Sequence, residues 1–371
     1  MADPILVVNA GSSTLKLSVV RSAGAAVGSS TLDPWDGGAD SAADAISALV
    51  GAGPIRAVGH RVVHGGASFT GPVLVDAQTR DAIAALTPLA PLHQPGALAG
   101  IDAARRVVGD VPSVACFDTA FHAHLPIAAA TYALPAEWRA RWPLRRYGFH
   151  GLSHRWAAGR AALLLDRPVD ELAVVTCHLG AGASLCAVAG GASVDTTMGF
   201  TPLDGLMMAT RSGSVDPGIL THVQRRYGLG AEQIEDALNQ ASGLFGVSGI
   251  SGDMREVLAA GRAGDERARL AIAIYVHRVR QAIGALTVTL GGIDALVFTA
   301  GVGENSAEVR VATCQGLECL GLELDADANA RCRPDADIAR PSARARILVV
   351  ATREDLAMLS DVVRVIAADK E

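Results

Sequence analysis

Two segments about half a chain apart share one local pattern, in which a glycine-rich turn separates two runs of apolar residues. The turn is Gly11–Ser13 within residues 5–20, and Gly180–Gly182 within residues 172–188. Leucine and β-branched residues on both sides of such a turn are typical of a β-hairpin. The repeat predicts a duplicated fold in which each half contains one of these hairpins. Two unrelated hairpins would give the same pattern, so the pattern alone leaves that alternative open.

Helical and strand patterns alternate along the rest of the chain. Asp216-Pro217 combines a helix N-cap with a proline at the first helical position, and Gly291-Gly292 ends a run of helical spacing. In chain order we expect a helix that begins at Asp216-Pro217, a helix over 267–290, a strand over 294–300, a turn over 301–306 that opens a helix at Ala307, a strand over 347–351 and a helix from about Arg353. Alternating strands and helices indicate an α/β fold.

The composition excludes several functional classes. With 371 residues the chain is long enough for two domains, and 50% apolar with 19% charged residues are globular proportions. A net charge of −6 argues against nucleic acid as a partner, because that partner needs a basic surface. No apolar run reaches the roughly 20 residues that cross a bilayer, and the first residues lack the pattern of a secretion signal. We therefore expect a soluble, cytoplasmic protein with no membrane partner and with reduced cysteines.

Glycine-rich turns follow three buried strands, after Val8, Cys177 and Thr299. Because glycine has no Cβ atom, such a turn lets several backbone N–H groups point at one anion. Three of these turns on a duplicated α/β scaffold suggest a nucleotide held between two domains. None of them matches the P-loop or the dinucleotide-binding GxGxxG motif.

Histidines and two arginines are placed unusually. Eight of the ten histidines lie between His60 and His178, which favours a polar cleft; metal binding is the alternative, although no HExxH spacing occurs. Most arginines are expected on the solvated surface. Arg61, however, lies where a strand passes into Gly65-Gly66, and Arg211 lies in a loop with apolar residues before it. A planar guanidinium suits carboxylate and phosphoryl oxygens, so we expect both arginines to be functional.

Seven motifs in the same order along the chain resemble the acetate kinase family: Val8–Lys16, Gly59–Gly66, Ala90–His93, Phe117–His122, Arg146–Gly151, Asp195–Met208 and Phe298–Asn305. The resemblance runs from Ile5 to about Asp361. It implies the fold of the acetate and sugar kinase, Hsp70 and actin superfamily, with two duplicated ribonuclease-H-like domains of the actin-like ATPase fold and ATP in an interdomain cleft. It also implies a homodimer. We expect an N-terminal domain of residues 1–120 plus 354–371, and a C-terminal nucleotide-binding and dimerisation domain of residues 121–353.

The activity implied by the resemblance is reversible phosphoryl transfer between ATP and acetate, which gives acetyl phosphate and ADP by direct in-line transfer. The enzyme would be a phosphotransferase with a carboxyl group as acceptor, with Mg²⁺ or, alternatively, Mn²⁺ as its cofactor. A propionate or butyrate kinase is one alternative, because one methylene changes binding by only about 1–3 kcal/mol. A non-catalytic, ATP-dependent switch of the same fold is another. The two arginines beside an apolar pocket argue against a switch, which has no need of an acyl site.

The resemblance assigns residues to the metal and the nucleotide. It places Asn9 and Glu354 at the Mg²⁺. The residues assigned to the phosphates come from both hairpins: Ser12, Ser13, Lys16, His178, Leu179, Gly180, Ala181 and Gly182. Those assigned to the adenosine are Asp253, Met254, Arg255, Gly301, Val302, Gly303, Glu304 and Asn305. Ala181 departs from the family, which has asparagine there, so we expect weaker nucleotide binding without loss of activity.

The resemblance also assigns an acyl and phosphoryl-transfer site. Arg61 and Arg211 would flank the carboxylate and the transferring phosphoryl group, His150 would stabilise the transition state, and Asp118 is the family's catalytic aspartate. The residues that match the acyl side are Val63, Leu92, His93, Phe149 and Pro202. Because a carboxylate is already a nucleophile, the reaction needs charge neutralisation more than a general base. We therefore expect Asp118 to orient Arg211 or a nearby cation rather than to abstract a proton.

Overall fold

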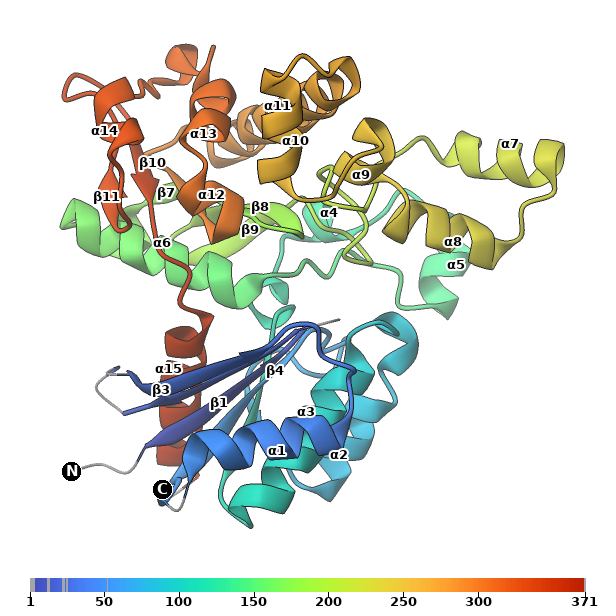
Figure 1. The fold of residues 1–371 in the computed structure, drawn as a ribbon, viewed down its shortest axis with the longest axis vertical. Coiled ribbons are helices and arrows are strands. Elements are labelled where there is room, and N and C mark those ends of the chain that lie inside the picture. Colours follow the sequence, from blue (N-terminus) through green and yellow to red (C-terminus); the bar gives the residue numbers. More distant parts are fainter. Residues whose placement is uncertain (1–3, 12–13, 22–23, 25, 52, 370–371) are drawn as a thin grey trace. The chain divides into compact units, whose positions relative to one another are not determined.

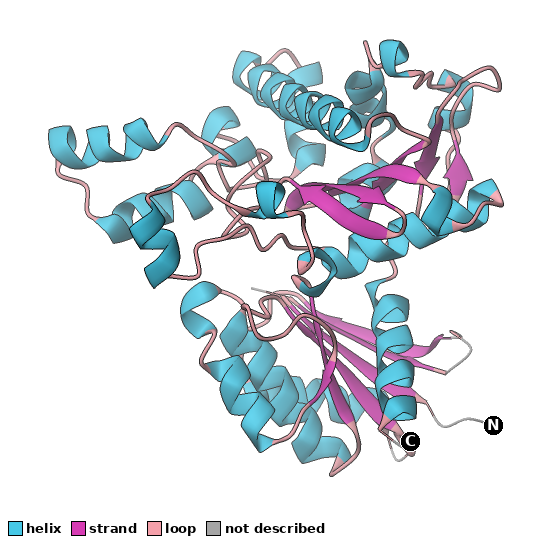
Figure 2. Ribbon diagram, turned by 180° about the vertical axis from the view of Figure 1, so that it is seen from behind, coloured by secondary structure: helices cyan, strands magenta, loops and turns pink. Residues whose placement is uncertain are grey.

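The computed structural model describes residues 4–11, 14–21, 24, 26–51 and 53–369. The chain forms two compact units, whose course along the sequence is coloured in Figure 1. Unit 1 comprises residues 1–123, 149–156 and 353–371, and unit 2 comprises residues 124–148 and 157–352. Each unit contains a six-stranded sheet with helices packed on it (Figure 2), so the predicted α/β class is confirmed.

The sheet of unit 1 has the strand order β3-β2-β1-β4-β6-β5. The strands β1, β2 and β3 form an antiparallel meander, β4 runs parallel to β1, β6 runs parallel to β4, and β5 runs antiparallel to β6. Their bounds are β1 (Ile5–Ala10), β2 (Leu15–Val20), β3 (Ala26–Leu32), β4 (Ala57–Val62), β5 (Val73–Leu74) and β6 (Ser113–Phe117).

The sheet of unit 2 repeats this arrangement, with the order β9-β8-β7-β10-β12-β11. Its first three strands are again an antiparallel meander, β10 and β12 follow in parallel, and β11 is antiparallel to β12. The bounds are β7 (Ala173–Leu179), β8 (Ala183–Ala189), β9 (Ala192–Thr196), β10 (Ala295–Thr299), β11 (Ala336–Asp337) and β12 (Arg346–Val349). Strand order and direction match position by position, so the predicted duplication is confirmed.

Helices cover both faces of the unit 1 sheet (Figure 1). Alternate residues of β1 point to opposite faces, as the pleat of a strand requires. Leu6 and Val8 pack in a core with α1 (Ala39–Val50) and α3 (Gln94–Val108), beside which α2 (Ala77–Ala84) also packs. Ile5 and Val7 pack in a second core with α15 (Glu354–Ala368). Burial on both faces explains why the strand sequence is continuously apolar.

Unit 2 contains the longest helix, α11 (Glu266–Leu290), which packs on strands β7, β8 and β9. The helix α6 (Gly151–Leu165) begins in unit 1 and ends in unit 2. The other helices after residue 123 are α4 (Ile127–Ala130), α5 (Ala136–Arg141), α7 (Pro217–Tyr227), α8 (Ala231–Gln240), α9 (Gly243–Ser248), α10 (Met254–Arg262), α12 (Ala300–Asn305), α13 (Ala307–Cys314) and α14 (Ala326–Ala330). Short 3₁₀ turns are η1 (Thr87–Leu89), η2 (Ala120–His122), η3 (Val169–Glu171) and η4 (Glu318–Leu320).

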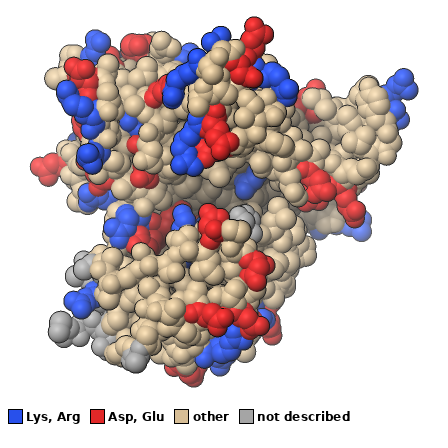
Figure 3. Space-filling model, viewed as in Figure 1, with Lys and Arg blue, Asp and Glu red and all other residues tan. Residues whose placement is uncertain are grey.

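The element predictions from the sequence are mostly confirmed. Asp216 caps α7 by accepting a hydrogen bond from Gly218 N, and Gly291 ends α11 with a φ of 73°. One prediction was wrong: residues 301–306 are not a turn, because Ala300–Asn305 form helix α12. Within the described ranges, no helix is long and apolar enough to cross a membrane. On the face in Figure 3, acidic and basic side chains are interspersed.

Candidate active site

Three polar side chains of unit 1 lie where parallel strands end. Asn9 near the end of β1 is in register with Arg61 of β4, and Asp118 directly follows β6. The Asp118 backbone N–H donates to Val62 O at 3.0 Å, which fixes the position of Asp118 beside the end of β4. The carboxyl ends of parallel strands are where open α/β sheets bind their ligands. The strand register therefore brings together residues that lie far apart in the sequence.

Arg61 is held by two of its neighbours in this cluster. Its Nε donates to both carboxylate oxygens of Asp118, at 3.1 and 3.2 Å, and its Nη2 donates to Asp118 Oδ2 at 2.6 Å. Its Nη1 donates to Asn9 Oδ1 at 3.1 Å. The Arg61 side chain is 14% exposed and that of Asp118 is 1% exposed. The predicted role of Asp118 in orienting a cation thus corresponds to a bidentate pair with Arg61.

Burial and charge act in opposite directions on this pair. Burial would lower the pKa of Arg61, but the charges of Asp118 and Glu354 outweigh it and raise that pKa. Burial raises the pKa of Asp118, and the Arg61 charge offsets this only in part. With both of its oxygens accepting from a guanidinium, Asp118 is suited to hold Arg61 and poorly placed to accept a proton from a substrate.

His150 lies on a tight turn that Asp118 also holds. The His150 backbone N–H donates to the Asp118 carboxylate, and Gly151 N donates to Asp118 O at 3.0 Å. His150 has a φ of 56°, which is unusual for a residue with a side chain, and a Cβ atom on Gly151 would collide with Asp118 O. Buried His122 donates from Nε2 to Phe149 O at 3.0 Å. The turn is therefore fixed from both sides, and the half-buried His150 is presented beside the Arg61–Asp118 pair.

The two residues predicted to hold Mg²⁺ are in direct contact. Asn9 Nδ2 donates to Glu354 Oε2 at 2.8 Å, and Glu354 is the first residue of α15. An amide oxygen and one carboxylate suit Mg²⁺, which keeps several waters and takes its other ligands from phosphates. No group of three or more His, Cys, Asp or Glu residues that could cage a metal occurs among the described residues. The donor set therefore fits a metal that arrives with a phosphorylated substrate.

Four residues of the predicted acyl side belong to unit 1. Val63 and Phe149 are buried, and the ring of His64 packs edge-on against that of Phe149 at 5.5 Å. This contact brings the segment that follows β4 next to Phe149. Leu92 is 53% exposed, and His93 at the start of α3 is partly buried. The fifth predicted residue, Pro202, belongs to unit 2.

The hairpin of unit 2 ends in the predicted phosphate turn. Gly180 N donates to Gly182 O at 2.9 Å, which closes the turn and leaves Ala181 exposed. His178 on β7 is in register with Thr299 on β10, so the turn lies beside the start of α12. Leu179 is buried and belongs to the core. In the first hairpin, Ser12 and Ser13 lie outside the described residues, whereas Lys16 has an exposed side chain and is in register with Asn9.

Helix α12, which contains the predicted adenosine residues 301–305, is fixed at both ends by side chains. Thr352 Oγ1 accepts from Ala300 N at 2.8 Å, and Glu304 Oε1 accepts from Thr352 N at 2.9 Å. Buried Arg310 donates to the carbonyl oxygens of Gly303 and Glu304, both at 2.8 Å. The Glu304 side chain is thus engaged with Thr352. A nucleotide would meet α12 mainly through its backbone and through exposed Gly301 and Asn305.

The other predicted adenosine residues begin helix α10. Asp253 caps the helix by accepting from Arg255 N at 2.8 Å, and its carboxylate also pairs with the Arg255 guanidinium at 2.5 Å. Met254 is buried and Arg255 is 90% exposed. A Cβ atom on the preceding Gly252 would lie 3.2 Å from Ala209, whose N–H donates to Ala181 O. The segment before α10 therefore adjoins the phosphate turn by way of Ala209.

Arg211 lies in the long loop between β9 and α7, and no described residue serves as its counter-ion. Its Nη1 donates to Pro202 O at 3.0 Å and approaches Met208 Sδ at 3.6 Å. Within the described part of the chain, no carboxylate pairs with it. Burial lowers the pKa of Arg211, and no neighbouring charge offsets that effect. A half-buried guanidinium with unused donors is suited to receive an anionic ligand.

A family model provides the deciding comparison. The model of the acetokinase family matches residues 41–360 of the chain. The chain belongs to this family. It is 55% identical over 307 residues to an acetate kinase of Cyanothece sp., and the match covers 83% of the chain and 75% of that relative. The crystal structure of an acetate kinase of Porphyromonas gingivalis is similar over 98% of the chain and 100% of its own, with a TM-score of 0.92 and 35% identity.

A second similar solved structure is named for a different substrate. A propionate kinase of Francisella tularensis matches 97% of the chain and 99% of its own length, with a TM-score of 0.88 and 35% identity. Solved structures similar to this chain are therefore named for two different acyl substrates, acetate and propionate.

Sequence reasoning missed two residues that shape the acetokinase site. Arg310 lies in a helix and reads as a solvated surface arginine, although it is 2% exposed and holds α12. Thr352 precedes Arg353-Glu354, and its position between a strand and the glutamate predicted to hold the metal is the one signal that could have indicated it.

Proposed function

We propose that the protein is an acetate kinase, which transfers a phosphoryl group reversibly between ATP and acetate. The observation that carries the proposal is the Arg61 cluster, in which a buried carboxylate, an amide and a second carboxylate surround one guanidinium. Relatives named acetate kinase at 50–55% identity support the same activity. Both reactants are anions, so the protein must supply positive charge and precise positions more than acid–base chemistry.

In the proposed mechanism Asp118 acts through Arg61. Its bidentate hydrogen bonds fix the plane of the guanidinium, so that the remaining donors can be directed at the acetate carboxylate or the transferring phosphoryl group. His150, held by its backbone at Asp118, donates to an equatorial oxygen in the transition state. Arg211 of unit 2 is proposed to contribute a guanidinium to the transferring phosphoryl group.

The nucleotide is proposed to bind through unit 2. The backbone N–H groups of Ala181 and Gly182, in the turn that the Gly180 N–H closes, would hold phosphate oxygens, while α12 and the start of α10 would hold the adenosine. Lys16 would add a cation. Asn9 and Glu354 would hold Mg²⁺, which would neutralise phosphate charge, and Mn²⁺ could replace it. Ser12 and Ser13 remain proposed phosphate ligands.

The acyl methyl group is proposed to contact Val63, Leu92, Phe149 and Pro202, with His93 nearby. A propionate kinase is a second candidate, supported by the Francisella tularensis relative. One methylene is worth about 1–3 kcal/mol in an apolar pocket, so both acids can be substrates. A comparison of kcat/KM for acetate, propionate and butyrate decides between them.

We also propose a cytoplasmic homodimer. Large apolar side chains on the helices of unit 2 are exposed, including Ile219 of α7 and Val288 of α11 at 52% and 78%. Apolar surface of this kind is suited to an interface between subunits. Sedimentation of the purified protein tests the assembly.

A hydroxamate assay for acetyl phosphate tests the activity. We expect ATP consumption that requires both acetate and Mg²⁺, and equal amounts of ADP and acetyl phosphate. ATP hydrolysis that is independent of acetate would instead support the ATP-dependent switch. Turnover of propionate well above that of acetate would favour the second candidate.

A further inference from the structure

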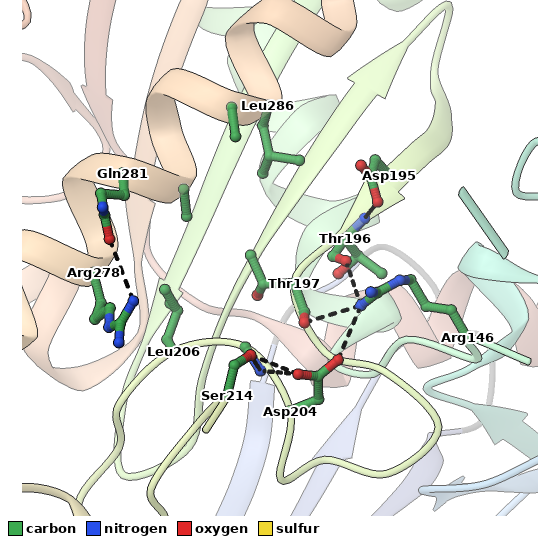
Figure 4. Close-up of a pocket in the computed structure, with 13 residues that line it drawn as sticks. Arg146, Asp195, Thr196, Thr197, Asp204, Leu206, Ser214, Arg278, Gln281 and Leu286 are labelled. Atoms are coloured by element: carbon green, nitrogen blue, oxygen red, sulfur yellow. Dashed lines mark hydrogen bonds and ion pairs between the residues drawn. The ribbon is translucent and has the colours of Figure 1, made fainter. Parts of the chain in front are cut away.

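Arg146, Asp204 and Ser214 form a hydrogen-bonded cluster in unit 2 at the end of strand β9, which we call the clasp. The clasp lies in the wall of a pocket of about 350 Å³ (Figure 4). Arg146 Nη1 donates to the carbonyl oxygens of three consecutive residues, Thr196 and Thr197 at 3.1 Å and Met198 at 2.9 Å. The same nitrogen lies 3.5 Å from Asp204 Oδ2. One guanidinium thus fixes the chain where it leaves the sheet.

Asp204 and Ser214 join the two ends of the loop that follows. Ser214 Oγ donates to Asp204 Oδ1 at 2.6 Å, and Gly205 N donates to the same oxygen at 2.9 Å. The Ser214 N–H donates in turn to Gly205 O at 3.0 Å. Figure 4 shows Arg146, Asp204 and Ser214 in one chain of hydrogen bonds on the same side of the pocket. Residues 204–214 therefore form a closed loop tied to β9 through Arg146.

Arg211 lies inside this closed loop. Met208 N donates to Arg211 O at 3.0 Å, which makes a tight turn around it. Gly213 has a φ of 70°, and a Cβ atom there would collide with Leu206 O, so the loop is tightly packed on both sides of Arg211. The guanidinium itself contacts Pro202 O, which belongs to the stretch between Arg146's carbonyl partners and Asp204.

A second group supports the same stretch. The Cζ atom of Arg146 lies 5.6 Å from the centre of the Tyr132 ring, and the Tyr132 hydroxyl oxygen accepts from Phe200 N at 2.8 Å. The carbonyl partners of Arg146 and the Phe200 amide are therefore held together. Pro202, the backbone partner of Arg211, follows two residues later.

We infer that Arg146, acting through Asp204 and Ser214, is a positioning residue for Arg211 in phosphoryl transfer. Among the described residues no carboxylate pairs with Arg211, so its direction depends on the backbone that carries it and on Pro202 O. The hydrogen bonds of Arg146, Asp204 and Ser214 fix that backbone. The inference rests on the proposed function, because it assigns Arg211 to the transferring phosphoryl group.

Arg146→Met and Arg146→Lys test the inference, with Arg278→Met as a matched control. Arg278 lines the same pocket, but the one hydrogen bond of its guanidinium to a described residue is to Gln281 Oε1, at 3.5 Å. Loss of the clasp should lower kcat on the order of 10²-fold, the scale for a displaced catalytic group, and leave KM for ATP little changed. A lysine ammonium can donate to several of the same carbonyls, so Arg146→Lys should recover much of the loss. Arg278→Met should behave as the wild type.

A double-mutant cycle separates positioning from a general loss of structure. If Arg146 acts through Arg211, Arg146→Met should cost little in an Arg211→Ala background, because coupled residues are not additive. Equal losses in both backgrounds, or an Arg146→Met variant as active as Arg278→Met, would overturn the inference and leave the proposed function standing. A wild-type protein without acetate-dependent turnover would overturn both.

Discussion

Two arginines, one in each unit, are held in opposite ways. Arg61 in unit 1 has a buried counter-ion, and its guanidinium donates to Asp118 and Asn9. Arg211 in unit 2 has no carboxylate partner among the described residues and donates to the carbonyl oxygen of Pro202. The pKa of Arg61 is raised by its neighbours' charges against the effect of burial, whereas burial lowers the pKa of Arg211.

This difference means that Arg61 is suited to orient a ligand, whereas Arg211 is suited to attract one by its charge. The Arg61–Asp118 pair is nearly neutral as a unit, so Arg61 contributes directed hydrogen bonds more than net charge. Arg211 keeps a charge that no described carboxylate pairs with, and an incoming anion would meet it in a partly desolvated site where electrostatic interactions are stronger. Two guanidiniums of the same chemistry are therefore suited to different tasks, Arg61 to directed hydrogen bonds and Arg211 to binding an anion by its charge.

Arg61→Ala should have the largest effect, because it removes a catalytic group and also leaves Asp118 buried without its partner. We expect kcat to fall roughly 10²–10³-fold. The free energy of unfolding should fall by about 3–5 kcal/mol, the scale for breaking a buried ion pair by removing one partner. The hydroxamate assay and urea denaturation at pH 7 measure the two losses.

The double variant Arg61→Ala/Asp118→Ala serves as the control for that experiment. Removing the stranded carboxylate should restore part of the stability while activity stays low. If Arg61→Ala is as stable as the wild type, the carboxylate is not held as a buried ion, and the contrast with Arg211 fails.

Arg211→Ala should lower kcat by a similar factor, roughly 10²–10³, without the loss of stability. The hydrogen bond to Pro202 is lost, but so is the cost of burying an unpaired charge, so we expect the free energy of unfolding to change by no more than about 1 kcal/mol. The same two assays compare it directly with Arg61→Ala.

Arg211→Lys sharpens this result. A lysine keeps the charge but lacks the planar fork, so it should restore only part of kcat if geometry matters as well as charge. Full recovery would mean that charge alone is needed. A loss of several kcal/mol in Arg211→Ala would contradict the view that Arg211 lacks a structural partner.

The sequence reveals the duplicated sheets because their hairpins are long and apolar on both sides of glycine-rich turns. The edge strands β5 and β11 have two residues each and leave no periodic signal. Helix α12 was misread as a turn because Gly301 and Gly303 are poor helix formers. Tertiary contacts override that preference: Thr352 accepts from the first N–H of the helix, and Arg310 binds carbonyls near its end.

The candidate site is only partly readable from sequence. The resemblance names Arg61 and Asp118, but their pairing follows from the parallel register of β4 and β6, which joins residues distant in the chain. The lack of a counter-ion at Arg211 depends on every side chain packed around its loop. No local pattern encodes such an absence. The clasp at Arg146 likewise acts on carbonyl groups, whose direction the residue types do not reveal.

A buried histidine of unit 1 makes the stability of the protein sensitive to acid. His60 on β4, next to Arg61, is fully buried, and neither ring nitrogen has a hydrogen-bond partner in the described part of the chain. Burial lowers its pKa to about 3, although the charge of Asp102 opposes this. Since the unfolded chain takes up this proton near pH 6.5 and the folded one does not, stability is complete above pH 6.5 and falls as the pH drops toward 3.

His60→Leu should therefore flatten the pH dependence of stability. Between pH 7 and pH 5 the wild type should lose about 2 kcal/mol of unfolding free energy at this residue, from about 1.4 kcal/mol per pH unit below 6.5. His122, whose pKa burial lowers to about 4, still titrates in the variant, so the dependence should shrink without vanishing. Urea titrations at the two pH values measure the difference. An unchanged slope would mean that His60 is not shielded from water.

Ala181→Asn should have the smallest effect, and it should change nucleotide binding alone. Ala181 is exposed on the phosphate turn and its carbonyl accepts from Ala209 N at 3.1 Å, two residues before Arg211. An asparagine amide there could donate to a phosphate oxygen, which is worth about 1.5 kcal/mol, so KM for ATP should fall by up to about tenfold with kcat and KM for acetate unchanged. In the control Ala181→Leu, the leucine side chain is nearly the same size as asparagine but has no amide group, so this variant should not lower KM for ATP. If the asparagine variant binds ATP no better than the leucine variant, the turn does not reach the phosphates through this side chain, and the backbone N–H groups of Ala181 and Gly182 must carry the contact alone.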